Sequence, residues 1–266
     1  MEACFVIDKP RSGEDNMAID QSMLEFTDRT GQVVLRFYEW LVPTVSLGYF
    51  QSLSQRHDHT ESKALEIVRR ATGGGAIVHH YDWTYSVSVP GRLLFNYSDQ
   101  KRSRQDIGAS PHLYNALHDS IVEWLQREGV PAQKWASNGA PEKLPSDTCR
   151  CAFLCFERRA LGDVVVGQHK VLGSAQRRLG GSILQHGSIL ISRSTFAPSL
   201  VGLTELGVAT SLENLKEGFT QSIRIGFEQA FAVSLPQVDS VFQALGLEKH
   251  ELSKSKFHRP EWLNSR

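Results

Sequence analysis

The sequence predicts an α/β (α+β) fold in which helices flank a mixed β-sheet. Short β-branched and aromatic segments alternate with longer segments of helical periodicity along the chain. Hydrophobic residues make up 41% of the 266 residues and charged residues 22%, which is typical of a soluble globular protein and excludes a disordered one. The length fits one large domain or two small ones, and it allows a core without disulfide bonds.

One helix and five strands are predicted for the first ninety residues. Asp15 can cap a helix over about residues 16–28, which carries apolar side chains on one side. The chain must turn at Gly73–Gly75, since glycine adopts backbone angles that other residues avoid. β-branched and aromatic segments interrupted by Pro and Gly predict strands at about 32–40, 44–48, 63–69, 76–80 and 83–90.

A second helix and two pairs of strands are predicted for the middle of the chain. Ser110 is a suitable N-cap and Pro111 suits the first helical position. Apolar residues then recur every four positions, and Gly129 and Pro131 end the helix. The segments that follow are a loop at 132–151, a hairpin of strands 163–167 and 170–176 that turns at Gly167, and another strand pair within 182–192.

The end of the chain is predicted to contribute one more long helix, over about 212–227. We expect residues 1–240 to form the main domain, in which the residues from about 197 make a smaller C-terminal helical part. Residues 241–266 are expected to form a polar, loosely held tail.

Charge and composition exclude several classes of protein. The 29 Lys and Arg residues balance 29 Asp and Glu residues, so no electrostatic reason favours nucleic acid or a membrane surface as a partner. The N-terminus lacks the pattern of a secretory signal, and no apolar window reaches the ~18 residues of a membrane span. Four cysteines are too few for a secreted disulfide scaffold. We therefore expect a cytoplasmic, reducing compartment.

The first motif with chemical potential is the segment RRATGGGA at residues 69–76. The N–H groups of its glycines can cradle an anion or an acyl carbonyl, and two arginines add positive charge. The Lys-Ser/Thr pair of a phosphate-binding P-loop is missing, and the spacing of a dinucleotide fingerprint is absent. A tight turn between strands remains the purely structural interpretation.

The second motif, GQHKVLGSAQ at residues 167–176, places Lys170 at a hairpin before an apolar strand. Such a lysine is usually solvated. If it points into a pocket, its ammonium can neutralise a developing oxyanion or phosphate, orient an acyl carbonyl or take part in proton transfer.

Three of the four cysteines, Cys149, Cys151 and Cys155, lie within seven residues. Three interpretations are open. The thiolates can bind a metal if His169 or His186 supplies a further ligand, although no CxxC pair is present. The cysteines can be small buried hydrophobic residues. One of them can be a nucleophile that a nearby cation activates, and Cys155 is closest to the strand that carries Lys170.

Three histidines, His79, His80 and His186, are weaker candidates for a site. Phe37, Trp83 and Tyr85 are expected in the core or in a pocket wall.

Four blocks in a fixed order resemble the superfamily of lipoate–protein ligases and octanoyltransferases, which includes the biotin–protein ligases. They are RRATGGGAIVH, TYSVSVP, HKVLGSAQRR and LQHGSILIS, and SLGYFQ at residues 46–51 resembles an upstream block. The resemblance covers about residues 15–230. It implies a mixed α/β domain whose sheet holds a tunnel for a medium-chain acyl group. In that case the glycine loop lines the carbonyl end of the tunnel and Lys170 contacts the acyl carbonyl.

Within this superfamily the sequence is most similar to the octanoyltransferases that form an acyl-thioester. Ligases typically carry an Asn-Asp-Leu element upstream of the lysine block, whereas Cys155-Phe156 stands there in this chain. Residues 83–86 also resemble the transferase branch. Two features depart from that branch. Residues 157–160 replace the usual Pro-Ser stretch, and the third glycine of the loop, Gly75, is the residue that ligases have at this position.

The resemblance implies an acyltransferase that moves octanoate from octanoyl-acyl carrier protein to a lysine of lipoyl-domain proteins, namely 2-oxoacid dehydrogenases or the glycine cleavage H protein. Cys155 is the expected nucleophile, and Lys170 is expected to stabilise the tetrahedral intermediate and to help deprotonate the acceptor amine. No cofactor and no metal is expected. The residues expected to bind substrate are Arg70, Thr72, Gly73, Gly74, Gly75, His79, Gly173, Ser174, Ala175 and His186.

Other activities stay open at this point. An ATP- and Mg-dependent lipoate ligase that forms a lipoyl-adenylate is the main alternative. An octanoyl amidotransferase between lipoyl domains and a non-catalytic regulator are further alternatives.

Overall fold

The computed structural model describes residues 2–95, 110–136, 152–208, 210–252 and 254–266. A seven-stranded mixed sheet forms the centre, with the strand order β1-β2-β6-β10-β9-β8-β7. β1 and β2 are parallel, and the other neighbours are antiparallel. The strands are β1 (Ala3–Ile7), β2 (Val33–Tyr38), β6 (Asp82–Pro90), β7 (Ala132–Lys134), β8 (Val164–Val166), β9 (His169–Leu179) and β10 (Ser182–Leu190).

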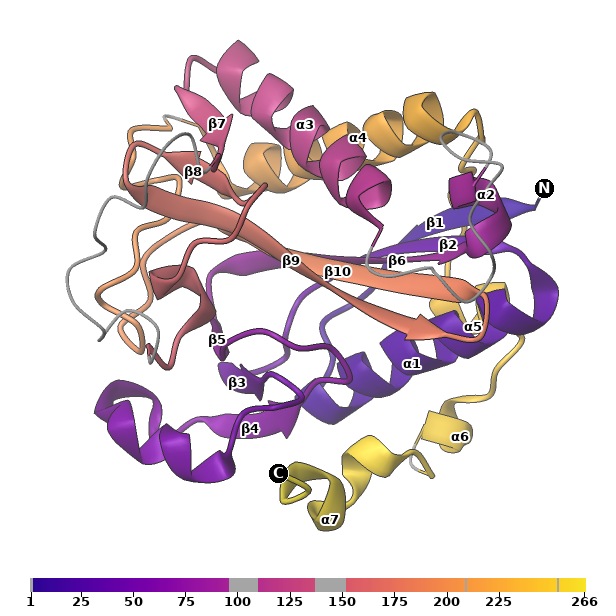
Figure 1. Cartoon of the computed structure of the whole chain (residues 1–266), viewed down its shortest axis with the longest axis horizontal. Helices are drawn as coiled ribbons and strands as arrows, with labels where there is room; N and C mark the ends of the chain where they lie inside the picture. Colours follow the sequence, from indigo (N-terminus) through magenta and orange to yellow (C-terminus); the bar gives the residue numbers. More distant parts are fainter. Residues whose placement is uncertain (1, 96–109, 137–151, 209, 253) are drawn as a thin grey trace.

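A second, three-stranded sheet has the order β4-β3-β5 and packs below the large one (Figure 1). Its strands are β3 (Thr44–Leu47), β4 (Glu66–Arg69) and β5 (Ile77–His79). Two short 3-10 helices, η1 (Leu53–Asp58) and η2 (Thr60–Ser62), connect β3 to β4. The glycine loop lies between β4 and β5, as the sequence predicts.

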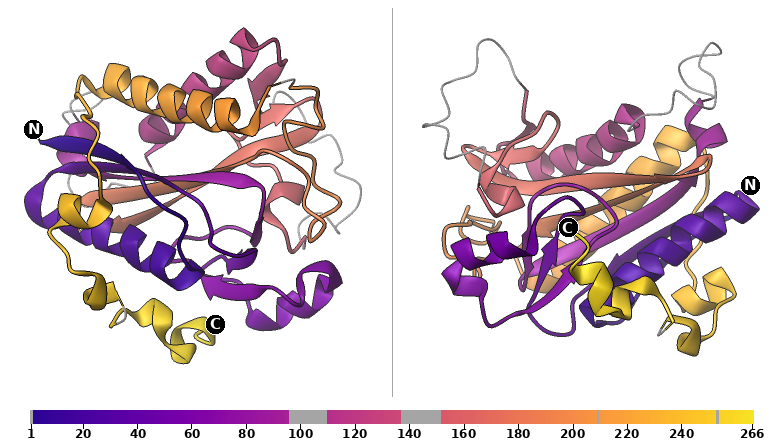
Figure 2. Two further views of the ribbon diagram at one scale, coloured as in Figure 1. Left: turned by 180° about the vertical axis from the view of Figure 1, so that it is seen from behind. Right: turned by 60° about the horizontal axis from the view of Figure 1, so that its bottom comes forward.

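Helices cover both faces of the large sheet, which confirms the predicted fold class. Figure 2 shows α3 (Pro111–Arg127) and α4 (Leu212–Phe231) on one face and α1 (Gly13–Thr30) on the other. Gly218 allows close packing of α3 and α4, because a Cβ atom there would lie 2.6 Å from the Trp124 indole nitrogen. The largest hydrophobic core lies between the helix pair α3 and α4 and the face of the large sheet that they cover.

Several predicted boundaries differ from the observed ones. The first helix begins at Gly13, and its N-cap is Ser12 rather than Asp15, since the Ser12 hydroxyl accepts the Asp15 N–H at 3.2 Å. The second helix has the predicted cap, because the Ser110 hydroxyl accepts from the Leu113 N–H. The predicted hairpin at Gly167 is also confirmed by the pairing of β8 with β9.

The expected strand pair within 182–192 is wrong, because β10 is a single continuous strand. Gly187 lies within this strand, where the lack of a side chain leaves room for neighbouring atoms. A Cβ atom at Gly187 would lie 2.2 Å from the Ser174 hydroxyl.

The expectation of a loop over 132–151 is also wrong for its first residues, since β7 pairs with β8 at the edge of the sheet. Residues 137–151 of that expected loop lie outside the described residues.

The residues after about 197 join the core of the large sheet, since Leu215, Phe219 and Phe227 of α4 are fully buried in it. The last residues, expected as a loose polar tail, pack on the side of α1. Phe257 is buried there, and the Arg69 guanidinium donates to the carbonyl oxygen of Leu263 at 2.8 Å. This segment comprises α5 (Val241–Leu245), α6 (Lys249–Leu252), η5 (Lys256–His258) and α7 (Pro260–Leu263). Two further short helices among the described residues are α2 (Gly91–Phe95) and η4 (Cys155–Glu157).

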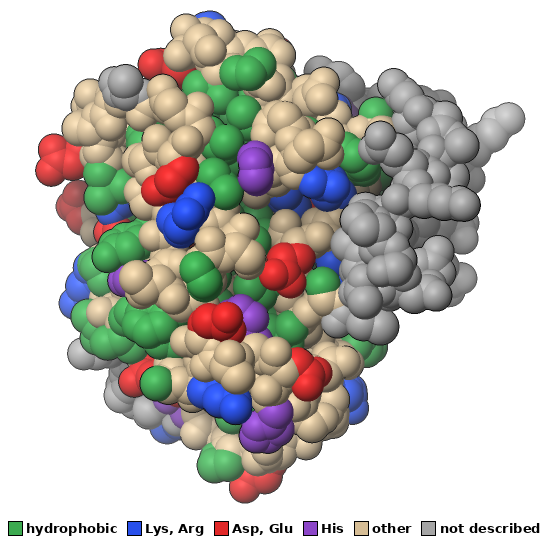
Figure 3. Space-filling view, turned by 90° about the vertical axis from the view of Figure 1, so that its left-hand side faces the viewer, with side chains coloured by type: hydrophobic (Ala, Val, Ile, Leu, Met, Phe, Trp, Pro, Cys, Tyr) green, Lys and Arg blue, Asp and Glu red, His purple; other side chains and the backbone are tan. Residues whose placement is uncertain are grey.

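The distribution of charged side chains on the surface is consistent with the zero net charge of the chain. Figure 3 shows acidic and basic side chains interspersed on one face of the molecule. Within the described ranges, no helix has the length and apolar character needed to cross a membrane.

Candidate active site

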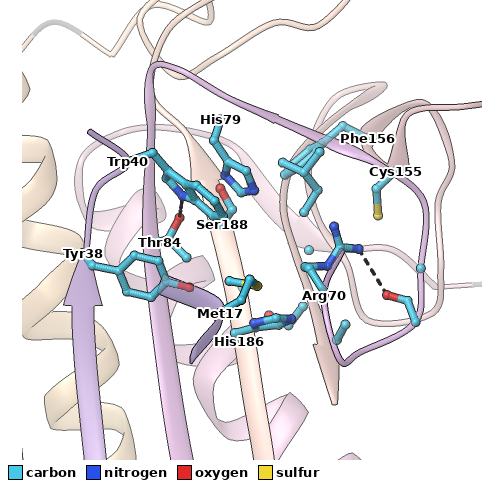
Figure 4. Close-up of a pocket in the computed structure, with 17 residues that line it drawn as sticks. Met17, Tyr38, Trp40, Arg70, His79, Thr84, Cys155, Phe156, His186 and Ser188 are labelled. Atoms are coloured by element: carbon cyan, nitrogen blue, oxygen red, sulfur yellow. Dashed lines mark hydrogen bonds between the residues drawn. The ribbon is translucent and has the colours of Figure 1, made fainter. Parts of the chain in front are cut away.

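A pocket between the two sheets brings together most of the residues that the sequence singled out. It encloses about 490 Å³, including the space at its mouth, and the surface facing it is almost entirely apolar. Figure 4 shows Cys155 and Phe156 on one side of the pocket and Tyr38, Trp40 and Thr84 on the other. Its lining residues are Met17, Tyr38, Trp40, Arg70, Gly73, Gly74, Ile77, His79, Thr84, Cys155, Phe156, Gly173, Ser174, Ala175, His186, Gly187 and Ser188.

The glycine loop holds Cys155 at the pocket through backbone contacts. The Cys155 N–H donates to the Ala76 carbonyl at 2.7 Å, and the Ala76 N–H donates to the Phe153 carbonyl at 3.0 Å. Gly75 permits this approach, because a Cβ atom there would lie 2.9 Å from the Cys155 nitrogen. Cys155 therefore sits at the start of η4, directly against the loop that the first motif predicted.

Arg70 is a buried cation beside this loop. Its guanidinium donates to the hydroxyl of Ser46 at 2.7 Å and to the carbonyls of Gly73 and Gly75 at 3.2 and 2.9 Å. Burial lowers the pKa of Arg70 to about 10, and the proximity of Cys155 opposes that shift. Its Nε–H is buried and has no hydrogen-bond partner.

Lys170 faces Cys155 from β9. Its Nζ lies 3.7 Å from the Cys155 Sγ and 2.7 Å from Oδ2 of Asp163, and both charged side chains are almost completely buried. The same carboxylate accepts from the Tyr114 hydroxyl at 2.9 Å and from the Ala160 N–H at 2.7 Å. Asp163 thus fixes the ammonium next to the thiol, a contact that places a positive charge where a thiolate or an oxyanion would form.

A chain of hydrogen bonds links α3 to β9 beside the pocket. Burial lowers the pKa of His118 to about 3, so its imidazole is neutral at pH 7. Its Nδ1–H then donates to the Gly162 carbonyl at 2.8 Å, and its Nε2 accepts from the Ser174 hydroxyl at 2.7 Å. Ser174 in turn accepts from the Tyr85 hydroxyl at 2.8 Å, which fixes the wall beside Gly173.

Two histidines line the pocket, and each is bound to a buried carboxylate. His79 contacts Asp82 at 2.7 Å and His186 contacts Asp20 at 3.0 Å, and the second nitrogen of His186 lies 2.6 Å from the Thr72 hydroxyl. Burial lowers the pKa of His79, and Asp82 only partly opposes it. Burial alone would raise the pKa of Asp82, but His79 and neighbouring hydroxyls together hold it below its usual range.

The structure therefore brings together all the expected site residues. Nine of them line the pocket: Arg70, Gly73, Gly74, His79, Cys155, Gly173, Ser174, Ala175 and His186. Thr72, Gly75 and Lys170 stand directly behind the lining, in contact with His186 and Cys155. His80 contacts the Ser194 hydroxyl at 3.0 Å instead, and it is not among the lining residues.

Sequence reasoning missed the carboxylates that orient this site, Asp20, Asp82 and Asp163, and it also missed His118. The only signal for Asp163 was its position in the DVVVG strand that pairs with the Lys170 strand. Nothing in the local sequence marks Asp20, which lies in a helix.

The structure assigns no metal site to the cysteine cluster. Among the residues it describes, no group of three or more His, Cys, Asp or Glu side chains is placed to hold a metal ion. Cys149 and Cys151, on which the metal interpretation depends, lie outside the described residues.

Comparison with known proteins gives one consistent family. The model for the lipoyl protein ligase A/B catalytic domain matches residues 12–202. A protein of Carboxydothermus hydrogenoformans named octanoyltransferase LipM is 31% identical, over 95% of this chain and 94% of that protein. One of the same name from Symbiobacterium thermophilum is 36% identical, over 79% of this chain and 72% of that protein.

Solved structures show the same fold at low sequence identity. A bi-partite lipoate protein ligase from Thermoplasma acidophilum, studied with its E2 lipoyl domain, has a TM-score of 0.67 at 18% identity and covers 99% of this chain and 96% of its own. A lipoate-protein ligase A bound with ATP has a TM-score of 0.67 at 19% identity and covers 99% of each chain. At these identities the likeness concerns the fold alone.

Proposed function

The chain belongs to the lipoyl protein ligase A/B catalytic domain family, and from this premise we propose that it transfers an octanoyl group to protein lysines through an acyl-Cys155 thioester. The resemblance seen in the sequence is confirmed, and so is the prediction of an acyltransferase. The observation that carries the proposal is Cys155 on the wall of an apolar pocket, with the Lys170 ammonium 3.7 Å from its sulfur.

In the first step, the Cys155 thiolate attacks the carbonyl carbon of an octanoyl thioester. The new S–C bond forms, and the oxyanion is stabilised by Lys170 and by N–H groups of the glycine loop. The C–S bond to the carrier then breaks, and the proton that Cys155 lost on forming the thiolate passes through Lys170 to the carrier sulfur, so the carrier leaves as a thiol. One thioester replaces another, so the step needs no ATP.

In the second step, the neutral ε-amine of an acceptor lysine attacks the acyl-Cys155 carbonyl. An amide bond forms while the S–C bond to Cys155 breaks. The proton that the amine loses passes through Lys170 to the departing sulfur, which lies within its reach.

The apolar pocket suits an alkyl chain. At about 0.8 kcal/mol per buried CH₂, a seven-carbon tail contributes on the order of 5 kcal/mol of binding free energy. Exclusion of water from the same space slows hydrolysis of the thioester intermediate.

The proposed partners follow from this chemistry and from the relatives. Octanoyl-acyl carrier protein is the donor, and lipoyl-domain proteins, either 2-oxoacid dehydrogenases or the glycine cleavage H protein, are the acceptors. The names of the relatives support octanoyl transfer, and the E2 lipoyl domain in a related archaeal system supports the acceptor class. We propose a cytoplasmic enzyme that uses no cofactor.

Intact-protein mass spectrometry after incubation with octanoyl-acyl carrier protein tests the proposal. The wild type is expected to gain one octanoyl group with or without ATP, and Cys155→Ala is expected to gain none. Lys170→Ala is expected to slow transfer to a lipoyl domain by at least about a hundredfold, the usual scale for a group that assists proton transfer.

Cys4→Ala is the matched control, since Cys4 is also a free cysteine but lies in β1, away from the pocket lining. Full transfer by Cys155→Ala would contradict the nucleophile assignment. A requirement for ATP and free lipoate would replace the transferase with the ligase activity.

A further inference from the structure

Asp82 is saturated with hydrogen bonds from the pocket wall. It accepts from His79 Nδ1 at 2.7 Å, from the Thr84 hydroxyl at 3.1 Å and from the Ser188 hydroxyl at 2.5 Å. All three of these side chains line the pocket. A fourth donor, the His80 N–H, lies 3.1 Å from the same carboxylate.

Asp20 likewise accepts hydrogen bonds from side chains on another part of the pocket wall. It accepts from the Tyr38 hydroxyl at 3.0 Å and from His186 Nδ1 at 3.0 Å, and both side chains line the pocket. The Ser86 hydroxyl and the Arg36 guanidinium complete its partners at 2.8 and 3.3 Å.

Five polar lining side chains therefore direct their hydrogen-bonding atoms away from the cavity and toward two buried carboxylates. This explains how a pocket with hydroxyl, phenol and imidazole groups in its wall presents an apolar surface. A polar atom brought into this space would lose its water and find no partner, which is energetically costly.

We propose that Asp82 and Asp20 are positioning residues that set the selectivity of the pocket for unsubstituted alkyl chains, an inference that rests on the proposed acyl transfer. They act through the side chains they bind and do not touch the substrate. In Figure 4 the Asp82 partner Thr84 and the Asp20 partner Tyr38 lie across the pocket from Cys155, where the end of an acyl chain attached to Cys155 would reach. An ω-hydroxyl group at that end is rejected because the hydroxyl hydrogens of Tyr38, Thr84 and Ser188 are already donated to the two carboxylates, and the surface that faces it is almost entirely apolar.

Replacing Asp82 with Asn keeps the shape of the side chain but changes which of its atoms can donate and accept hydrogen bonds. The three wall donors all bind Oδ2 of Asp82, whereas the His80 N–H binds Oδ1. An amide oxygen at the Oδ2 position is uncharged and has two lone pairs, so it holds three donors less well than the carboxylate does. The wall donor that is held least then becomes available to a polar acyl end or to water in the cavity.

Three acyl donors separate polarity from length: octanoyl-, nonanoyl- and 8-hydroxyoctanoyl-carrier protein. The nonanoyl chain has a methyl group where the hydroxylated chain has its oxygen, so the ratio of their kcat/KM values measures polarity alone. The wild type is expected to prefer the nonanoyl donor by about a hundredfold, the usual limit for an apolar pocket that meets an added hydroxyl. Asp82→Asn is expected to reduce this preference to about tenfold or less and to raise hydrolysis of the acyl-enzyme relative to transfer.

Asp8→Asn is the matched control, because Asp8 is an equally buried carboxylate, paired with Arg11 and Arg36, that bonds to no lining side chain. Thermal melting shows whether each variant is folded. If Asp82→Asn does not fold, Asp20→Asn carries the same expected loss of preference.

The inference is overturned if the wild type uses the nonanoyl and 8-hydroxyoctanoyl donors equally well. It is also overturned if the folded Asp variants keep the wild-type preference, or if Asp8→Asn loses it to the same extent. Absence of any octanoyl transfer by the wild type would instead contradict the proposed function, so the two failures are distinguishable.

Discussion

Lys170 shows how a single ion-pair partner keeps a buried side chain charged and in position. Its ammonium is removed from water, so it remains stable only because Asp163 holds it at 2.7 Å. Asp163 is itself fixed by the Tyr114 hydroxyl and the Ala160 N–H. The positive charge that faces Cys155 is therefore positioned by a residue that does not border the pocket.

Asp163→Asn is expected to lower the free energy of unfolding by about 3 kcal/mol, because it leaves a buried ammonium without its counter-charge. The double variant Asp163→Asn/Lys170→Met is expected to recover most of that loss, since both charges are removed. Urea unfolding measures both values.

The exposed pair of Lys134 and Asp119 provides the control. Asp119→Asn is expected to change stability by no more than about 0.5 kcal/mol, because water screens that pair. If Asp163→Asn were as mild as Asp119→Asn, the buried pair would not be what stabilises Lys170.

At the scale of elements, the site depends on three chain segments meeting at the glycine loop. β3 ends beside Gly48, which lies so close to Gly74 that a Cβ atom would come within 1.9 Å of the Gly74 carbonyl oxygen. On its other side, the loop is bridged to η4 through Ala76 and Cys155. A shift of β3 against the loop would therefore also displace Cys155, the proposed nucleophile.

Gly48→Ala is expected to destabilise the protein by about 1–3 kcal/mol and to slow acylation of Cys155, because the overlap is with backbone that has little room to move. Gly181→Ala is the control, since a Cβ atom at Gly181 meets nothing within 4 Å. Octanoyl transfer kinetics and thermal melting would be measured for both. If the two variants had equal melting temperatures and transfer rates, the loop would have adapted to the added methyl group without loss of stability or activity.

At the scale of the whole molecule, stability depends on pH through groups buried in the neutral form. His118 is completely buried in α3, and burial lowers its pKa to about 3, against about 6.5 in an unfolded chain. The unfolded state therefore binds a proton that the folded state does not. The stability contribution is complete above about pH 6.5 and is lost as the pH falls toward 3.

Between pH 7.5 and pH 5, this histidine alone is expected to reduce the free energy of unfolding by about 2 kcal/mol. The variant His118→Gln cannot titrate, so its loss over the same range is expected to be smaller by that amount. Denaturant unfolding at the two pH values measures the difference. An identical pH dependence in both proteins would show that His118 is not the titrating group.

The sequence by itself determined the fold class, the family and most of the residues that gather at the pocket, because these depend on local patterns. Periodicity located the long helices, and Ser110 correctly marked the start of the second. The three glycines marked the loop, and the blocks around Cys155 and Lys170 are contiguous in the chain. Local patterns failed where tertiary packing decided the outcome, as at Gly187, which lies inside a strand, and at 132–134, which became a strand only through pairing with β8.

Only the tertiary structure decided how the site is organised. Asp20 and His186 are 166 positions apart in the chain, yet they form one contact in the pocket wall. Asp82, Asp163 and His118 likewise acquire their roles from partners on other elements. A carboxylate in a helix looks the same in the sequence whether it faces solvent or a buried histidine, because its environment is set by the packing of distant segments.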